Sequence, residues 1–186
     1  MSDQTDARPP ADTRRGIAPA LRWCWRPFDA LAAGELHAAL ALRAAVFVVE
    51  QECVFLDPDD HDVQAHHLLG WHEPRAAKRQ LVAYLRVVMP GRKYAEPAIG
   101  RVVTAHAYRR SGVGRALMLE GLRRTRETYP GTGVRISAQR YLAAFYRDFG
   151  FAQVGAPYCE DGIPHVEMLL PANACTSARA GVGPIG

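Results

Sequence analysis

The sequence has no long hydrophobic run, few cysteines and almost no lysine. In its 186 residues no apolar stretch reaches the roughly 18 residues that a membrane-spanning helix needs, so we expect no transmembrane segment. Residues 1–19 are polar and carry proline and arginine without an apolar core, which does not fit a secretory signal. These absences lead us to expect a cytoplasmic protein that does not act at a membrane.

The cysteine and histidine content argues against a metal centre. The four cysteines are widely separated and form no C-x-x-C pair: Cys24, Cys53, Cys159 and Cys175. That spacing favours reduced thiols over a zinc site or a disulfide framework. His66 and His67 are adjacent, and adjacent side chains on a strand point to opposite faces, so one metal ion is not expected to use both. We therefore predict no metal cofactor.

The positive charge is carried almost entirely by arginine. The net charge is +4, and only Lys78 and Lys93 are lysines. The arginines are scattered and are not clustered with interleaved aromatic residues, so the sequence does not predict nucleic-acid binding. Their local excess between residues 109 and 126 instead suits a ligand that carries several phosphates.

A glycine-containing turn joins two predicted elements in the middle of the chain. It follows the apolar run 99–103 and opens a helical pattern. The first N–H groups of a helix lack intrahelical partners and lie at the positive end of its dipole, which suits an anion. Glycines let the backbone approach a diphosphate closely, and neighbouring arginines supply positive charge. The turn therefore predicts a site for a pyrophosphate-bearing cofactor. Its residues are Arg109, Arg110, Ser111, Gly112, Val113, Gly114 and Arg115.

The spacing of this turn limits the cofactor. No Lys-Ser or Lys-Thr pair closes it, which excludes the nucleoside triphosphatase loop, and Leu117 stands where GxGxxG requires its third glycine. The run from Arg109 to Gly114 instead reads as arginine, two residues, glycine, one residue, glycine. That pattern resembles the acetyl-CoA loop of the GNAT superfamily of N-acetyltransferases. The resemblance implies acetyl-CoA as co-substrate.

A second pattern lies further downstream. Residues 134–139 alternate like a strand, and residues 142–151 then read Leu-Ala-Ala-Phe-Tyr-Arg-Asp-Phe-Gly-Phe, a short helix ended by Gly150. This stretch resembles the second GNAT motif, in which a tyrosine is often the general acid for the departing thiolate. The resemblance gives that role to Tyr146. From the residues alone, Tyr146 is also consistent with a core aromatic whose hydroxyl is hydrogen-bonded.

Further segments narrow the resemblance. They are residues 42–53, 57–62, 66–71 and 160–166. Together they resemble the ElaA-like branch of the GNAT proteins, whose acceptor substrate is not generally settled. The likeness covers roughly residues 21–171 and implies an α+β fold in which a mixed central sheet carries helices on both faces. We therefore expect one GNAT domain at 21–171 between flexible tails at 1–20 and 172–186.

Hydrophobic periodicity and chain breakers predict the order of the elements. Strands are expected at 21–27, 66–71, 81–89, 99–104, 134–139, 151–156 and 165–170. Helices are expected at 29–45, 113–128 and 141–149. Gly34 is expected to interrupt the first helix, and residues 159–162 to form the turn of a closing hairpin.

The resemblance also implies where the rest of the donor binds. In the superfamily the strand before the phosphate loop splays from its neighbour, and its free backbone groups pair with the pantetheine arm. Here those positions are Val102, Val103 and Thr104. Many relatives place a catalytic glutamate on this strand, but Arg101 stands in that region.

An alkylamine with a pKa of roughly 10.4 is mostly charged at neutral pH, so some group must take its proton. Glu50 is the best candidate, because it ends the apolar stretch 46–49 that would set it at the edge of a cleft. A helix-end carboxylate in a salt bridge is the alternative interpretation. Structural roles are favoured for the weaker candidates His66, His67, His165 and Glu167.

The acidic loop contains Asp57, Asp59, Asp60 and Asp62. We interpret it as a solvated loop. If it borders the acceptor site, it would attract a cationic amine.

We therefore predict an acetyl-CoA-dependent N-acetyltransferase that moves an acetyl group to a primary amine by direct attack in a ternary complex. The acceptor is expected to be a small molecule or the lysine of a peptide, and the enzyme a monomer or a homodimer. One alternative is an acyl-homoserine-lactone synthase, a family that shares the fold and a start like Arg43 to Phe47 but lacks a well-formed loop of this kind. The other is a non-catalytic acyl-CoA-binding module.

Overall fold

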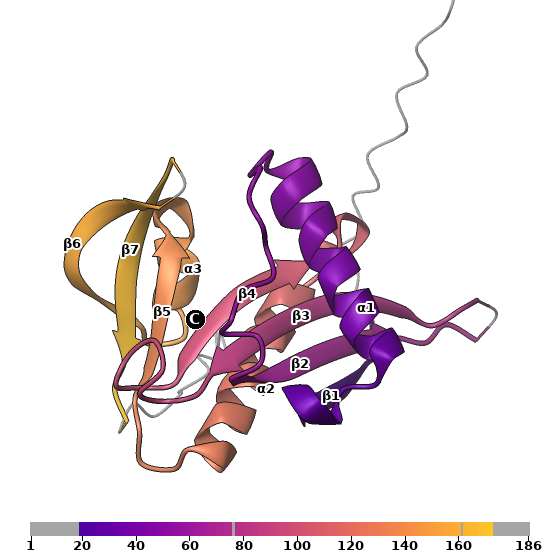
Figure 1. The fold of residues 1–186 in the computed structure, drawn as a ribbon, viewed down its shortest axis with the longest axis horizontal. Coiled ribbons are helices and arrows are strands. Elements are labelled where there is room, and N and C mark those ends of the chain that lie inside the picture. Colours follow the sequence, from indigo (N-terminus) through magenta and orange to yellow (C-terminus); the bar gives the residue numbers. More distant parts are fainter. Residues whose placement is uncertain (1–18, 76, 161, 173–186) are drawn as a thin grey trace, which may run out of the picture.

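The computed structural model describes residues 19–75, 77–160 and 162–172, and all of their strands belong to one sheet (Figure 1). The strands are β1 (Leu21–Pro27), β2 (Ala65–His72), β3 (Gln80–Val88), β4 (Ala98–Thr104), β5 (Val134–Gln139), β6 (Ala152–Glu160) and β7 (Ile163–Leu170). Their spatial order is β1-β2-β3-β4-β5-β7-β6. Neighbours are antiparallel except β4 and β5, which are parallel, so the sheet is mixed. The tails expected at 1–20 and 172–186 lie outside the described residues, apart from residues 19, 20 and 172.

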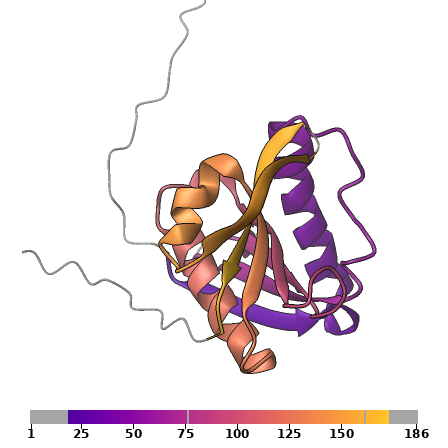
Figure 2. The ribbon, with the colours of Figure 1, turned by 90° about the vertical axis from the view of Figure 1, so that its left-hand side faces the viewer.

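Helices cover both faces of this sheet. They are α1 (Ala33–Arg43), α2 (Val113–Thr128) and α3 (Ala143–Arg147), with short 3-10 turns η1 (Phe28–Ala30), η3 (His106–Tyr108) and η4 (Arg140–Leu142). One face carries α1 and the other carries α2 and α3, as the two perpendicular views show (Figures 1 and 2). The expected architecture, a mixed sheet with helices on both faces, is confirmed.

Two hydrophobic cores join the helices to the sheet. Leu117 of α2 packs with Leu85 of β3 in the larger core, and Ala39 of α1 packs with Tyr84 of β3 in the smaller one. Alternate residues of β3 thus enter opposite cores. Because both of its faces are buried, β3 reads in the sequence as a nearly continuous apolar run and does not alternate with polar residues.

The first helix starts later than the sequence predicts. The chain makes the turn η1, and α1 begins at Ala33 and not at residue 29. The Glu35 carboxylate accepts the N–H of Ala32 at 3.1 Å, which satisfies a donor at the helix start. Gly34, expected as an interruption, therefore lies in the first turn of the helix.

The helix also continues past its predicted end at residue 45. It widens into the π-helix η2 (Ala44–Glu50). The N–H of Gln51 donates to the carbonyl of Val46 at 3.0 Å, five residues earlier, which is the bond that defines this winding. Val46 is buried, and Glu50 is the last residue of the π-helix.

The C-terminal hairpin is longer and its turn tighter than expected. β6 runs to Glu160, which pairs with Ile163 at the start of β7. The pairing shifts between Val154 and Tyr158, where Gly155 has a φ of 76°, so the hairpin contains an irregularity that increases its twist. Glu160 consequently lies at the end of a strand and not in an open turn.

Candidate active site

β4 and β5 pair at one end and separate toward the other, as Figure 1 shows. Within the described residues the paired positions are Ala98 with Arg135 and Ile99 with Ile136. Both strands continue beyond this point, β4 to Thr104 and β5 to Gln139. The two parallel strands therefore form a wedge that opens toward their carboxyl ends.

A β-bulge in β4 accounts for the wedge. Leu85 of β3 lies opposite two residues of β4, Arg101 and Val102, and Arg101 has a φ of 51°. An extra residue bends a strand and interrupts its pairing. The predicted pantetheine-binding residues 102–104 consequently lie on the part of β4 that has turned away from β5.

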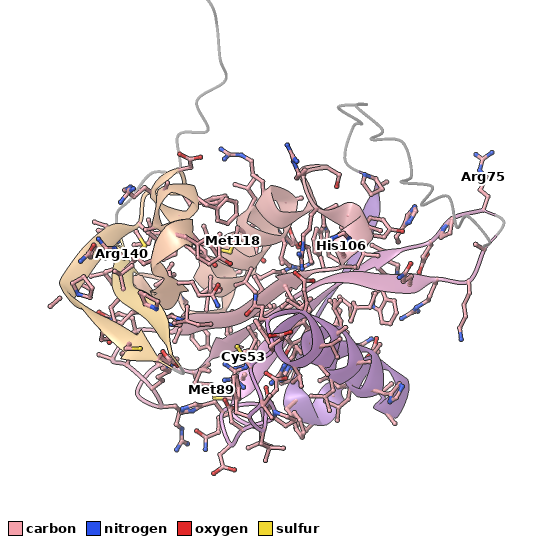
Figure 3. All side chains as sticks on the ribbon, turned by 90° about the horizontal axis from the view of Figure 1, so that it is seen from above. Cys53, Arg75, Met89, His106, Met118 and Arg140 are labelled. Atoms are coloured by element: carbon pink, nitrogen blue, oxygen red, sulfur yellow. The ribbon has the colours of Figure 1, made fainter. Side chains whose placement is uncertain are left out.

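A cavity of about 490 Å³ occupies the wedge. Its walls are residues 98–104 of β4, residues 136–139 of β5, η2 with the segment that follows it, and the β6–β7 hairpin. Figure 3 shows Cys53, from the segment after η2, on the side of the sheet that α1 covers, and Met118 of α2 on the opposite side. Cys53 lines the cavity, whereas Met118 belongs to the larger core.

Tyr146 lies on the wall of this cavity. It comes from α3, is 6% exposed, and makes edge-on ring contacts with Phe145 and Phe151. Burial raises the pKa of its hydroxyl, and the neighbouring Tyr141 raises it further, so the hydroxyl is protonated at neutral pH. Within the described residues no hydrogen-bond partner holds this hydroxyl. It can therefore donate its proton to a group inside the cavity.

The glycine-containing turn has the backbone geometry that an anion site needs. Gly112 precedes α2 with a φ of 89°, and no side chain caps the first N–H groups of the helix. Arg110 also has a positive φ, of 61°. The Ser111 hydroxyl donates to the Tyr108 carbonyl at 2.6 Å, so it is used within the turn. The N–H groups at the start of α2 are consequently available to an anion.

Two of the predicted site residues contact each other. The guanidinium of Arg109 donates two hydrogen bonds to the Glu50 carboxylate, one of them of 2.8 Å, and both residues line the cavity. These bonds lower the pKa of Glu50 and raise that of Arg109. The adjacent Gln51 accepts a hydrogen bond of 3.3 Å from Gln139 at the end of β5. Glu50 therefore lies at the open end of the wedge.

The acidic loop is largely buried, contrary to expectation. Asp57 and Asp62 are only 3% and 5% exposed. The Arg43 guanidinium bonds to both, with 2.7 Å from Nε to Asp57 Oδ2 and 2.7 Å from Nη1 to Asp62 Oδ1. Arg86 Nη1 lies 2.6 Å from Asp62 Oδ1. Burial acts to raise the pKa of Asp62, but the two guanidinium groups outweigh it and lower the pKa below its ordinary value.

Arg101, at the bulge of β4, completes this network. Its Nε lies 2.8 Å from Asp57 Oδ1, a contact between charges in which the N–H is not aimed at the oxygen. Asp59 is shared, since it pairs with Arg86 at 2.6 Å and with Arg101 at 3.3 Å. Three arginines therefore balance three aspartates. The interpretation as a solvated loop is wrong for Asp57 and Asp62, and the arginines neutralise the charge of all three aspartates.

The adjacent histidines lie on opposite faces of β2, as expected. His66 hydrogen-bonds to the Tyr129 hydroxyl at 3.1 Å. His67 is buried between the Tyr84 hydroxyl at 2.7 Å and the Asp62 carbonyl at 2.9 Å. Burial lowers the pKa of both rings, and neither lines the cavity. Within the described part of the chain, no three potential metal ligands gather at one place, and no helix has the length and hydrophobicity to span a membrane.

Of the other weak candidates for a base, one reaches the cavity. Glu167 pairs with Arg135 at 3.1 Å and does not line the cavity. His165 does, and its Nδ1 lies 2.8 Å from the Ile163 carbonyl within the same hairpin.

A polar cluster around Ser137, beside the last residue of β5 that pairs with β4, was not predicted from the sequence. Ser137 of β5 hydrogen-bonds to the Tyr158 hydroxyl, and its Oγ lies 3.1 Å from Glu160 Oε2. The Tyr158 hydroxyl is 3.4 Å from the same carboxylate oxygen. Ser137 and Glu160 both line the cavity. The available signal was the two-residue spacing of Tyr158 and Glu160, which places both side chains on one face of a strand.

Comparison with known proteins identifies the family. A sequence profile of the acetyltransferase (GNAT) domain matches residues 75–171. A UPF0039 protein of Synechocystis is 42% identical over 150 residues, which cover 81% of this chain and 95% of that protein. The chain belongs to the GNAT acetyltransferase family. The GNAT fold and the enzyme class, an acyltransferase, follow from this membership.

Two other GNAT-fold proteins support the ElaA-like branch. Protein ElaA of Escherichia coli is 40% identical over 140 residues, which cover 74% of this chain and 88% of that protein. Its crystal structure matches with a TM-score of 0.74 and 37% identity, covering 81% of this chain and 99% of that chain. An acyl-CoA N-acyltransferase from Pseudomonas aeruginosa matches with a TM-score of 0.75 and 39% identity over the same shares. The resemblance to ElaA-like GNAT proteins is confirmed.

Proposed function

We propose that this GNAT enzyme transfers the acetyl group of acetyl-CoA to a primary amine, by direct attack of the amine in a ternary complex. The observation that carries the proposal is the wedge between β4 and β5. Beyond Ile99 the backbone of β4 does not pair with β5, and the cavity follows it to Thr104. Unpaired strand backbone can bond to an extended, amide-containing chain such as pantetheine. Val102, Val103 and Thr104 are the proposed partners of that arm.

The turn before α2 is the proposed diphosphate site. The N–H groups of Val113, Gly114 and Arg115 are the first of the helix, and Gly112, with its positive φ, directly precedes them without a side-chain cap. Arg109 supplies charge from the cavity wall. Arg110 and Ser111 complete the turn and contribute through their backbone.

Tyr146 is the proposed acid. When the amine nitrogen attacks the acetyl carbonyl, the bond from carbon to sulfur breaks and the sulfur needs a proton. The Tyr146 hydroxyl is on the cavity wall and holds its proton at neutral pH.

The attacking amine must also lose a proton. Two carboxylates line the cavity, Glu50 and Glu160. The ion pair with Arg109 lowers the pKa of Glu50, the base that the sequence favours, and so weakens it as a proton acceptor for as long as the pair persists.

Donor binding is tested by thermal unfolding with and without acetyl-CoA. At a hundredfold excess over Kd, a ligand specific for the native state adds about 2.7 kcal/mol of stability. We expect this shift in the wild type and its loss in Gly112→Val, because a β-branched residue resists a φ of 89° and would block the diphosphate. Gly131→Val is the matched control, since Gly131 has a φ of 75° in the turn after α2 and carries a similar backbone strain.

Both variants should lose stability, but only Gly112→Val should lose the response to acetyl-CoA. An undiminished response in Gly112→Val would refute the loop assignment. Turnover is then tested by thiol release with a panel of primary amines. Donor binding without turnover on any amine would favour the acyl-CoA-binding module.

A further inference from the structure

Among the described residues, one carboxylate that lines the cavity has no cationic partner. Of the two that line it, Glu50 is bound by Arg109. Glu160 is held by hydroxyl groups, since Ser137 Oγ lies 3.1 Å and the Tyr158 hydroxyl 3.4 Å from its Oε2. Within the described residues no arginine, lysine or histidine forms an ion pair with Glu160, and its Oε1 has no hydrogen-bond partner. That oxygen is free to bind a positively charged group.

The hydroxyl groups form a chain that orients this carboxylate. If Ser137 donates to Glu160, the hydrogen bond between Ser137 and Tyr158 is donated by Tyr158. Tyr158 is itself stacked on His165, with ring centroids 6.0 Å apart. The chain fixes Oε2 without adding any positive charge and uses no donor on Oε1.

The position of Glu160 matches the reacting end of the proposed donor. Ser137 directly follows Ile136, the last residue of β5 that pairs with β4. The backbone of Glu160 pairs with Ile163, level with the carboxyl end of β5, and its side chain reaches back to Ser137, so its carboxylate lies near the closed end of the wedge. Gln139, at the end of β5, contacts the Glu50 side. With the diphosphate at the start of α2, the pantetheine arm runs from the open end inward. The thioester then lies nearer to Glu160 than to the diphosphate.

We propose that Glu160 binds the ammonium group of the acceptor and takes up its proton, with Ser137 and Tyr158 as positioning residues. This inference rests on the proposed function, and it specifies the acceptor as an aliphatic primary amine that arrives protonated. One proton passes from nitrogen to Glu160, and the neutral nitrogen then forms its bond to the acetyl carbon as the bond from carbon to sulfur breaks. The nitrogen releases a second proton to solvent as the amide forms, and Tyr146, which has given its proton to sulfur, takes one up from solvent.

The other charged groups nearby do not replace Glu160. Glu167 on β7 is paired with Arg135. Lys93 lines the cavity at an exposed position, and its ammonium lies 5.5 Å from the centroid of the Tyr94 ring. The positive charge of Lys93 disfavours a second cation in the cavity, and a carboxylate such as Glu160 offsets this repulsion.

The test compares two acceptors that differ in charge. With acetyl-CoA as donor, 1,4-diaminobutane arrives protonated, whereas 4-methylaniline, a weakly basic aromatic amine, arrives neutral. Glu160→Gln should lower kcat/KM for 1,4-diaminobutane about 100-fold or more, and for 4-methylaniline by less than about 3-fold. Ser137→Ala should show a smaller loss of the same selectivity. Glu127→Gln, on the exposed side of α2, is the charge-matched control and should change neither.

Separate measurements distinguish a failure of this inference from a failure of the proposed function. Calorimetry with acetyl-CoA on the wild type tests the donor site, and no binding there refutes the proposed function. If acetyl-CoA binds but Glu160→Gln affects both acceptors equally, or neither, the inference is overturned and the proposed function stands. The same holds if Glu50→Gln and not Glu160→Gln removes the selectivity. If neither amine is acetylated, calorimetry with 1,4-diaminobutane in the presence of CoA decides. Binding that Glu160→Gln abolishes supports the inference, and its absence overturns it.

Discussion

Glu50 and Arg109 form a two-bond ion pair at the open end of the cavity, although 59 positions separate them in the sequence. The proposed diphosphate site lies next to Arg109, so we expect a bound donor to compete with Glu50 for the same guanidinium. Donor binding and the state of Glu50 would then be coupled. In the absence of the donor, Glu50 is a charged carboxylate held by Arg109.

Glu50→Gln is expected to tighten acetyl-CoA binding about 1.4- to 5-fold. A partly exposed ion pair is worth about 0.2–1 kcal/mol, and the donor no longer has to displace it in the variant. Isothermal titration calorimetry measures the change, with Glu127→Gln as a control of equal charge. Weaker binding in Glu50→Gln would show that Glu50 supports the donor site and does not compete with it.

Tyr146→Phe is expected to lower kcat about 100-fold while the Kd for acetyl-CoA stays unchanged, because the hydroxyl acts on the departing sulfur. Burial raises the pKa of Tyr146, so its ionisation should cause no loss of rate up to about pH 10. A pH profile of kcat checks this. Tyr141→Phe, which removes an exposed hydroxyl nearby, should have a much smaller effect. Equal effects of the two substitutions would argue against Tyr146 as the acid.

Asp62→Asn is expected to destabilise the protein by about 3–5 kcal/mol at neutral pH. It removes a buried charge that Arg43 and Arg86 share, and the two guanidinium groups are left undercompensated. Urea unfolding measures the loss. Asp60→Asn, in the same loop, is the control and should stay within about 0.5 kcal/mol of the wild type. Similar losses in both variants would mean that the network contributes nothing specific.

The same network predicts how stability depends on acid. The pKa values of Asp59 and Asp62 are lowered in the folded state, below the ordinary value of about 3.9. The stabilisation is therefore complete above about pH 4 and is lost as the pH falls through the folded pKa values. Urea unfolding between about pH 5 and pH 2 should show a shallower decline in Asp62→Asn than in the wild type. Parallel declines would contradict this origin of the acid sensitivity.

Local patterns predict some elements to the residue. The structure places α2 at Val113–Thr128 and β5 at Val134–Gln139, as the sequence indicates. Both have a clear period, and Pro130-Gly131 ends the helix before the strand begins. The π-helix η2 could not be predicted in this way, because a single widened turn adds no repeating pattern to the sequence.

The candidate site also contains parts that the sequence predicts and parts that it does not. The glycine turn and Tyr146 belong to contiguous motifs, which a linear pattern can show. The network of Arg43 with Asp57 joins residues 14 positions apart, and Ser137 lies 23 positions from Glu160. Nothing in the local sequence indicates which arginine meets which aspartate, or that a residue within the predicted turn reaches Ser137 on β5. These contacts depend on the register of strands that pair over long distances.

Arg101 connects two walls of the cavity. Its backbone forms the bulge that turns β4 away from β5, and its guanidinium holds Asp57 and Asp59. Those aspartates follow Cys53 and Phe55, which line the opposite wall. Arg101 thus joins the proposed gap for the donor to the wall that faces it, so we expect the two to move together. Substrates are therefore expected to enter through exchange of side-chain partners, such as the release of Glu50, and not through the swing of a hinged loop.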